Sequence, residues 1–499
     1  MGSHKHPHMR PRSQPGWRLA VMSAVLLFVA AAVAFAQPKT GAEPPQRLVL
    51  LDVAATNAKG EPVTDLRASE IQIREDGKAH PAAFFHFAGP KRAMLPLVEG
   101  ESANRPAVTP TLILFDRWNE RLTVALSAWG NLGAALQRLE SVDSIFIYFL
   151  TNHGDLFPVH PVPSADADLR AMVEPTPVQL RGKLDDAVRT LNGFRDVDVE
   201  DPFLRINTTF RALYMLGSQM AAIAGRKNLI WVTHGFPVTL MLPEIIDFAP
   251  QIRQFSAAAT ASQIAIYTVD ESTQGAADMG SVFRQTLDMF SSLTGGRLYP
   301  TDNTPEALSA AITDGRGNYR LAYYSPTHPK DRKEHRIRLE SSRKGVRLLT
   351  SEGFFGDVAE PDPAALEHSL FSSVPHSPFE ASEIGVRVAL SPAPSGSATH
   401  FAIHIDPADI LLEQRDGSYR GQLALLFAFY SHGFLERAAA PVHIDVNLTP
   451  DQFSQAQKDG IDASQDVEVS SDAEKIRVIV MDRKLYALGS VTVSPLRPR

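Results

Sequence analysis

The stretch Thr111-Leu112-Ile113-Leu114-Phe115-Asp116 is the most informative part of the sequence for the fold. It is a continuous apolar run that ends in a carboxylate. Strands that are buried on both faces, as in parallel sheets covered by helices, have such continuous runs rather than an alternating pattern. We therefore predict a central parallel strand over 111–116, with Asp116 at its carboxyl end.

Comparable apolar runs recur along the chain and alternate with helical patterns. The further runs lie at 144–150, 229–232, 264–269 and 319–324. Over 122–139, apolar residues recur at three- and four-residue spacing, which indicates an amphipathic helix. We expect further helices over 183–191, 208–224, 243–262, 283–293 and 305–312. This alternation predicts an α/β fold class, a doubly wound and mainly parallel sheet with helices on both faces, which we assign to 108–326.

The segments on either side of this domain have β patterns. Residues 47–90 form a small unit with a hairpin signal, Glu75-Asp76-Gly77-Lys78, because Asp-Gly tolerates the positive φ angles of a tight turn. Such a unit is too small to be stable alone, so we expect strands within 327–357 to pair with it. After a linker over 358–380, regularly spaced strands over 381–499 predict an all-β, sandwich-like domain.

The first 36 residues have the pattern of a secretory signal peptide. Basic residues precede an apolar run over 19–35, which ends in Ala34-Phe35-Ala36. We expect cleavage near Ala36, a linker over 37–46, and a periplasmic or secreted mature protein that does not span the membrane. The alternative is an uncleaved anchor, because about 17 apolar residues can just span a bilayer.

Composition excludes several classes of function. Lys and Arg number 49 against 56 Asp and Glu, and no basic cluster stands out, so a nucleic-acid partner is not expected. The chain has no cysteine, so it contains no disulfide and no thiolate nucleophile. The sequence also lacks the G-x-S-x-G, H-E-x-x-H and phosphate-loop motifs. We therefore predict that the protein is not an enzyme.

Several motifs in a fixed order carry a family resemblance. They are IQIREDGK at 71–78, the strand at 111–116, Thr208 and Thr209 with 227–235, YRLAYYSP at 319–326, and GFF at 353–355. Over about residues 47–357 the chain resembles von Willebrand factor type A domain proteins, of the exported type described in acidobacteria. The resemblance implies binding at the carboxyl ends of the strands.

The resemblance also implies a metal-ion-dependent adhesion site, from which this sequence departs. The family pattern is Asp-x-Ser-x-Ser, a loop threonine, and an aspartate in Thr-Asp-Gly. Asp116 keeps the first position, but Trp118 and Glu120 occupy the serine positions, and His234 replaces the second aspartate. Imidazole suits Zn²⁺ better than Mg²⁺, which prefers hard oxygen ligands. We therefore predict a degenerate site and no cofactor.

The alternative is a weak divalent cation (Mg²⁺, Mn²⁺ or Zn²⁺) held by Asp116 with Thr208 or Thr209. Each position also has a simpler interpretation. Asp116 can cap the next segment, with Asn119 as a more local cap, and Glu120 can favour a helix dipole. His234 can be a polar loop residue, and Trp118 is either an exposed anchor or a ring folded over the sheet edge.

The sequence therefore predicts an exported, non-enzymatic module that binds an unknown protein partner without metal. The candidate partner-binding residues are Asp116, Trp118, Glu120, Thr208, Thr209 and His234. Two alternatives stay open. One is metal-dependent adhesion through Asp116 and Thr208 or Thr209, and the other is a hydrolase whose site has no recognised motif.

Overall fold

The computed structural model describes residues 46–88, 96–104, 109–119, 144–163, 176–193, 201–241, 244–270, 279–300, 303–315, 318–326, 333–355, 362–394 and 398–496. Residues 47–499 form one compact unit. The predicted signal peptide, the helix over 122–139 and Glu120 lie outside the described residues. Among the described helices, none is long and apolar enough to cross a membrane.

The run at 111–116 forms strand β6 (Thr111–Asp116), which lies inside a six-stranded sheet. The sheet order is β13-β12-β9-β6-β7-β8. The other strands are β7 (Ile145–Leu150), β8 (Leu156–His160), β9 (Lys227–Thr233), β12 (Ile264–Asp270) and β13 (Leu298–Pro300). Neighbouring strands run parallel, except that β7 and β8 are antiparallel. Every residue of β6 is buried, as its unbroken apolar run predicts.

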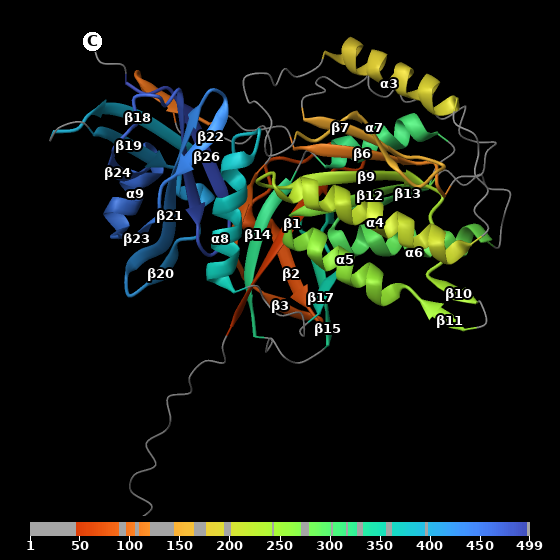
Figure 1. The fold of residues 1–499 in the computed structure, drawn as a ribbon. Helices are drawn as coiled ribbons and strands as arrows, with labels where there is room; N and C mark the ends of the chain where they lie inside the picture. Colours follow the sequence, from red (N-terminus) through yellow and green to blue (C-terminus); the bar gives the residue numbers. More distant parts are fainter. Residues whose placement is uncertain are drawn as a thin grey trace, which may run out of the picture. The chain divides into compact units, whose positions relative to one another are not determined.

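Helices cover both faces of this sheet (Figure 1). Leu112 and Leu114 share a core with α4 (Pro202–Ala221), α5 (Ala249–Ala261) and α6 (Met279–Thr294). Ile113 and Phe115 point to the opposite face, where α3 (Pro177–Asn192) and α7 (Thr304–Asp314) pack. The period of two along a strand explains why neighbouring residues of β6 reach different cores.

Two antiparallel sheets combine segments from far apart in the sequence. One has the order β16-β1-β14-β4 and the other β17-β15-β2-β3. Their strands are β1 (Arg47–Thr56), β2 (Ile71–Glu75), β3 (Lys78–His80), β4 (Ala82–Phe87), β14 (Asn318–Ser325), β15 (Glu334–Ser341), β16 (Arg347–Leu349) and β17 (Gly353–Phe355). Strands from 327–357 pair with strands from 47–90 in these sheets: β15 pairs with β2, and β16 pairs with β1.

Two further antiparallel sheets share one apolar core near the end of the chain. Their orders are β24-β19-β18-β5 and β20-β21-β25-β26, and β22 and β23 also pair with β21. The strands are β5 (Glu101–Ala103), β18 (Val386–Pro392), β19 (Thr399–Ile405), β20 (Glu413–Arg415), β21 (Ser418–Ser431), β22 (Phe434–Ala438), β23 (Val442–Leu448), β24 (Ile461–Val467), β25 (Lys475–Asp482) and β26 (Leu488–Val493). Helices α8 (Pro363–Ser373) and α9 (Pro450–Asp459) accompany them.

The predicted fold class, α/β with a doubly wound parallel sheet, is wrong for this chain. Of the six sheets in the part of the chain that the structure describes, five are antiparallel throughout: the four above and the two-stranded sheet of β10 (Thr239–Met241) and β11 (Ile245–Asp247). The run at 319–324, predicted as the last parallel strand, is β14, which pairs antiparallel with β1 and β4. An apolar run shows that a strand is buried, but it fixes neither the partner nor the direction of that strand.

Candidate functional site

Asp116, at the carboxyl end of β6, is enclosed by hydrogen-bond donors. Its Oδ2 atom accepts from the Asn119 amide at 2.6 Å, the Trp231 indole at 3.1 Å and the Thr233 hydroxyl at 2.8 Å. Its Oδ1 atom accepts from the Asn119 backbone N–H at 3.0 Å. Burial raises the pKa of Asp116 above its ordinary value, although these donors oppose the rise. The carboxylate is therefore engaged on both oxygens.

Asn119 connects Asp116 to α4, the helix that carries the candidate binding residues Thr208 and Thr209. Its side-chain amide also donates to the Thr209 hydroxyl at 2.9 Å, and that hydroxyl donates to the Arg205 carbonyl at 3.0 Å. Thr208 is buried one position earlier on α4. Asn119 therefore links Asp116 to Thr209. From the sequence, Asn119 was expected only to cap the segment that follows.

His234 directly follows β9 and is partly buried. Its Nδ1 atom is buried and has no hydrogen-bond partner among the residues that the structure describes. The neighbouring turn is held by the backbone N–H of Gly235, which donates to the Thr233 hydroxyl at 2.9 Å. Thr233 thus joins the Asp116 network to this turn.

Trp118 lies inside the protein, with only 5% of its surface exposed. Its indole N–H donates to the Arg205 carbonyl at 2.9 Å, and the Arg205 guanidinium lies over the ring, 5.5 Å from its centre. The Arg205 side chain also donates to the Trp118 carbonyl. These contacts hold the segment after β6 against α4. Trp118 is therefore not an exposed anchor for a partner.

The exposed apolar residues at this end of the sheet lie on a hairpin that the sequence analysis did not single out. Strands β10 (Thr239–Met241) and β11 (Ile245–Asp247) follow β9 and pair with each other. Met241 and Ile245 are cross-strand partners and are 84% and 72% exposed. Figure 1 shows the hairpin as two short strands between β9 and α5 in the sequence. The sequence feature that could have indicated this exposed hairpin is the apolar stretch 240–246, which has a proline at its centre.

Two further exposed apolar side chains lie at the start of α4. Phe203 and Leu204 are exposed in its first turn, where the Asp201 side chain accepts from both of their backbone N–H groups. The Phe203 ring lies 6.3 Å from that of Phe248, which follows β11. We call Phe203, Leu204, Met241 and Ile245 the hairpin surface.

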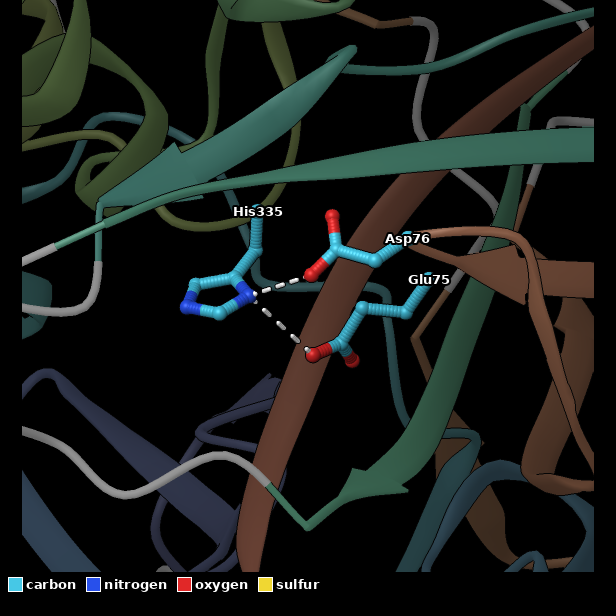
Figure 2. Close-up of side chains that lie close together, drawn as sticks. All are labelled: Glu75, Asp76 and His335. Carbon is cyan, nitrogen blue, oxygen red and sulfur yellow. Dashed lines mark hydrogen bonds and ion pairs between the residues drawn. The ribbon is translucent and has the colours of Figure 1, made fainter. Parts of the chain in front are cut away.

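A second cluster of polar side chains lies in the antiparallel sheets (Figure 2). The Nδ1 atom of His335 is 2.8 Å from Asp76 Oδ2 and 3.7 Å from Glu75 Oε1. One ligand atom from each side chain lies within 4.8 Å of the others. Nitrogen and carboxylate ligands of this kind suit Zn²⁺. In the described part of the chain, three potential metal ligands therefore meet far from Asp116 in the sequence.

The same cluster joins the segments that carry the family resemblance. Glu75 accepts hydrogen bonds from the hydroxyls of Tyr323 and Ser325, both at 2.9 Å. The His335 ring stacks on Phe354 with 5.1 Å between ring centres. The motifs at 71–78, 319–326 and 353–355 thus meet at one place. Their residues hold β2, β14, β15 and β17 together, which gives them a structural role.

No family model matches the chain, and no curated protein matches it. Among solved structures, it is similar to the pilus adhesin SpaC from Lactobacillus rhamnosus GG. In one crystal structure the identity is 8%, the TM-score is 0.27, and the match covers 85% of this chain and 57% of the adhesin. For the open conformation the values are 7%, 0.27, 86% and 56%. The chain thus spans little more than half of the adhesin's length, and so low a TM-score supports no argument about fold or function.

Proposed function

We propose that the protein is an exported, non-enzymatic module that binds another protein through the hairpin surface. The observation that carries this proposal is the exposed pair Met241 and Ile245 at the tip of a two-stranded hairpin. Contiguous apolar side chains on a protein surface mark sites of interaction, because their exposure to water is unfavourable. A partner with an apolar contact surface would remove these side chains from water.

The position of the hairpin supports the same proposal. It begins six residues after Thr233, the last residue of β9, so it extends from the edge where the sequence analysis placed binding. The two ends of the hairpin are joined, because Phe248 is buried and its backbone N–H donates to the Val238 carbonyl at 2.8 Å. A preorganised surface loses little conformational entropy on binding.

Binding is proposed to be independent of metal, because the Asp116 carboxylate already accepts four hydrogen bonds. A cation at this position would have to displace donors from Asn119, Trp231 or Thr233. The indole N–H of Trp231 would then be left buried without an acceptor, which costs about 1–3 kcal/mol.

Photocrosslinking tests the proposal directly. A photoreactive phenylalanine analogue at Met241 should form a covalent adduct with a defined partner in the exported protein fraction of the source organism. The same analogue at Val178, an equally exposed position on α3, is the matched control. The adduct at 241 should persist in chelator and disappear in Ile245→Ser. An adduct that forms equally at 178, or one that chelator abolishes, contradicts the proposal.

A further inference from the structure

A cavity of about 340 Å³ is lined by strand β1 and by helices α5 and α8, within the compact unit that the structure describes. This volume falls within the range of about 300–1,000 Å³ that is typical of pockets for small molecules. Its lining residues are far apart in the sequence and extend from Arg47 to Tyr486. The cavity is therefore a product of tertiary packing, which no local stretch of sequence indicates.

The wall of the cavity is mainly apolar. Leu48 and Leu50 lie two positions apart on β1, so both side chains leave the same face of the strand. Each helix contributes a pair of apolar residues at a spacing of four, which places them on one helix face. These pairs are Ala257 and Ala261 of α5, and Leu366 and Leu370 of α8. An apolar molecule in the cavity would remove these side chains from water.

The buried charges in and behind the wall balance one another. The cations are Arg226, Lys227 and Arg320. The carboxylates are Asp52, Glu383 and Asp482, and all three interact electrostatically with Arg320. The Nη1 atom of Arg320 is 3.2 Å from Asp52 Oδ1 and 3.7 Å from Glu383 Oε1. Three cations therefore face three carboxylates, and this cluster needs no bound ion to neutralise it.

Two members of this cluster also have hydrogen-bond partners within the protein. The Arg320 Nη2 atom donates to the Leu485 carbonyl at 2.8 Å. The Glu383 carboxylate accepts from the Gln263 side chain at 3.0 Å and from the Leu488 backbone N–H at 3.1 Å. The protein itself therefore supplies partners for these charged groups.

The other two arginines of the wall, Arg47 and Arg253, are also engaged by the protein. The Arg47 guanidinium lies over the Phe354 ring, 4.6 Å from its centre. A charged ligand would have to displace such contacts or remain unpaired in the cavity, and burying an unpaired charge is costly. The cavity therefore favours an uncharged ligand.

We propose that this cavity binds a small uncharged molecule with an apolar body, of the medium-chain alcohol type. The apolar body would pack against the leucines of β1 and α8 and against the alanines of α5. This binding does not depend on the hairpin surface, because none of the four residues of that surface lines the cavity.

Displacement of an uncharged fluorescent probe, N-phenyl-1-naphthylamine, from the full chain tests the charge of the ligand. One probe molecule should bind per chain. Three competitors share a ten-carbon body: decan-1-ol, decanoate and decyltrimethylammonium. Decan-1-ol should displace the probe at a concentration at least about tenfold lower than either ion, because each ion would be buried without a counter-charge. Failure of the probe to bind, or displacement by an ion that equals or exceeds that by decan-1-ol, would overturn the proposal.

Two matched variants on α5 locate the binding. Ala257 lines the cavity, whereas Ala258 does not, and both are exposed. Ala257→Trp should fill part of the cavity and weaken binding of the probe by at least about tenfold, while Ala258→Trp keeps the wild-type affinity. If the two variants bind the probe equally well, the probe lies elsewhere and the proposal fails.

Discussion

The hydroxyl of Tyr323 donates a 2.9 Å hydrogen bond to the carboxylate of Glu75, although 248 residues separate them in the sequence. Both side chains are buried. Burial, followed by the nearby negative charge of Glu75, raises the pKa of the Tyr323 hydroxyl, so it stays protonated and remains a donor. This bond ties β14 to the hairpin of β2 and β3, and it explains why Tyr and Glu occupy these positions.

Tyr323→Phe should lower the free energy of unfolding by about 1–3 kcal/mol, because Glu75 loses a donor while staying buried. Urea unfolding measures this change. The control is Tyr214→Phe, since Tyr214 is partly exposed on α4 and its change should stay within about 0.5 kcal/mol. If both variants unfold at the same urea concentration, the hydrogen bond contributes nothing to stability.

Asp116→Asn should destabilise the protein by an amount that decreases as the pH rises. The folded-state pKa of Asp116 is raised above the ordinary value of 3.8, so between these two values the folded state binds more protons than the unfolded state. The wild type therefore loses stability as pH increases through this window, and the asparagine variant has no such component. Urea unfolding of both proteins from pH 4 to pH 7 gives the difference, and a gap that widens with pH contradicts the prediction.

The sequence predicted the buried elements better than it predicted how they pair. The runs at 111–116, 144–150, 229–232 and 264–269 are strands of one sheet, because only a strand buried on both faces needs an unbroken apolar run. The turn at Asp76 and Gly77 also has the expected positive φ angles, 50° and 81°. These features depend on local chemistry, which a single sequence shows.

The partners of β14 and the contents of the candidate site depend on long-range contacts, which local patterns do not show. The apolar run at 319–324 fits a parallel or an antiparallel sheet equally well, and the structure places it antiparallel to β1. The meeting of Glu75 with His335, like that of Arg226 with Asp52, joins residues from distant parts of the chain. The resemblance to von Willebrand factor type A proteins stays a prediction.

Millimolar Mg²⁺ or Mn²⁺ should leave the melting temperature unchanged, because both oxygens of Asp116 already accept hydrogen bonds. A cation at a hundred times its dissociation constant would add about 2.7 kcal/mol, a shift of several degrees for a chain of this size. A shift that Asp116→Ala removes would restore the metal-dependent alternative. A shift with Zn²⁺ alone that His335→Gln removes would place the ion beside Glu75 and Asp76 instead.

Trp118→Ala should destabilise the fold by about 3–5 kcal/mol, the usual cost of removing a buried tryptophan. The ring packs against Arg205 and its indole N–H holds the Arg205 carbonyl, so truncation leaves both a cavity and a lost hydrogen bond. Met241→Ala, on the exposed hairpin, should change the free energy of unfolding by no more than about 0.5 kcal/mol. Denaturant unfolding of the two variants therefore separates a residue that stabilises the fold from one available to a partner. Small effects for both variants would contradict the prediction and would mean that the contacts of Trp118 with Arg205 contribute little to stability.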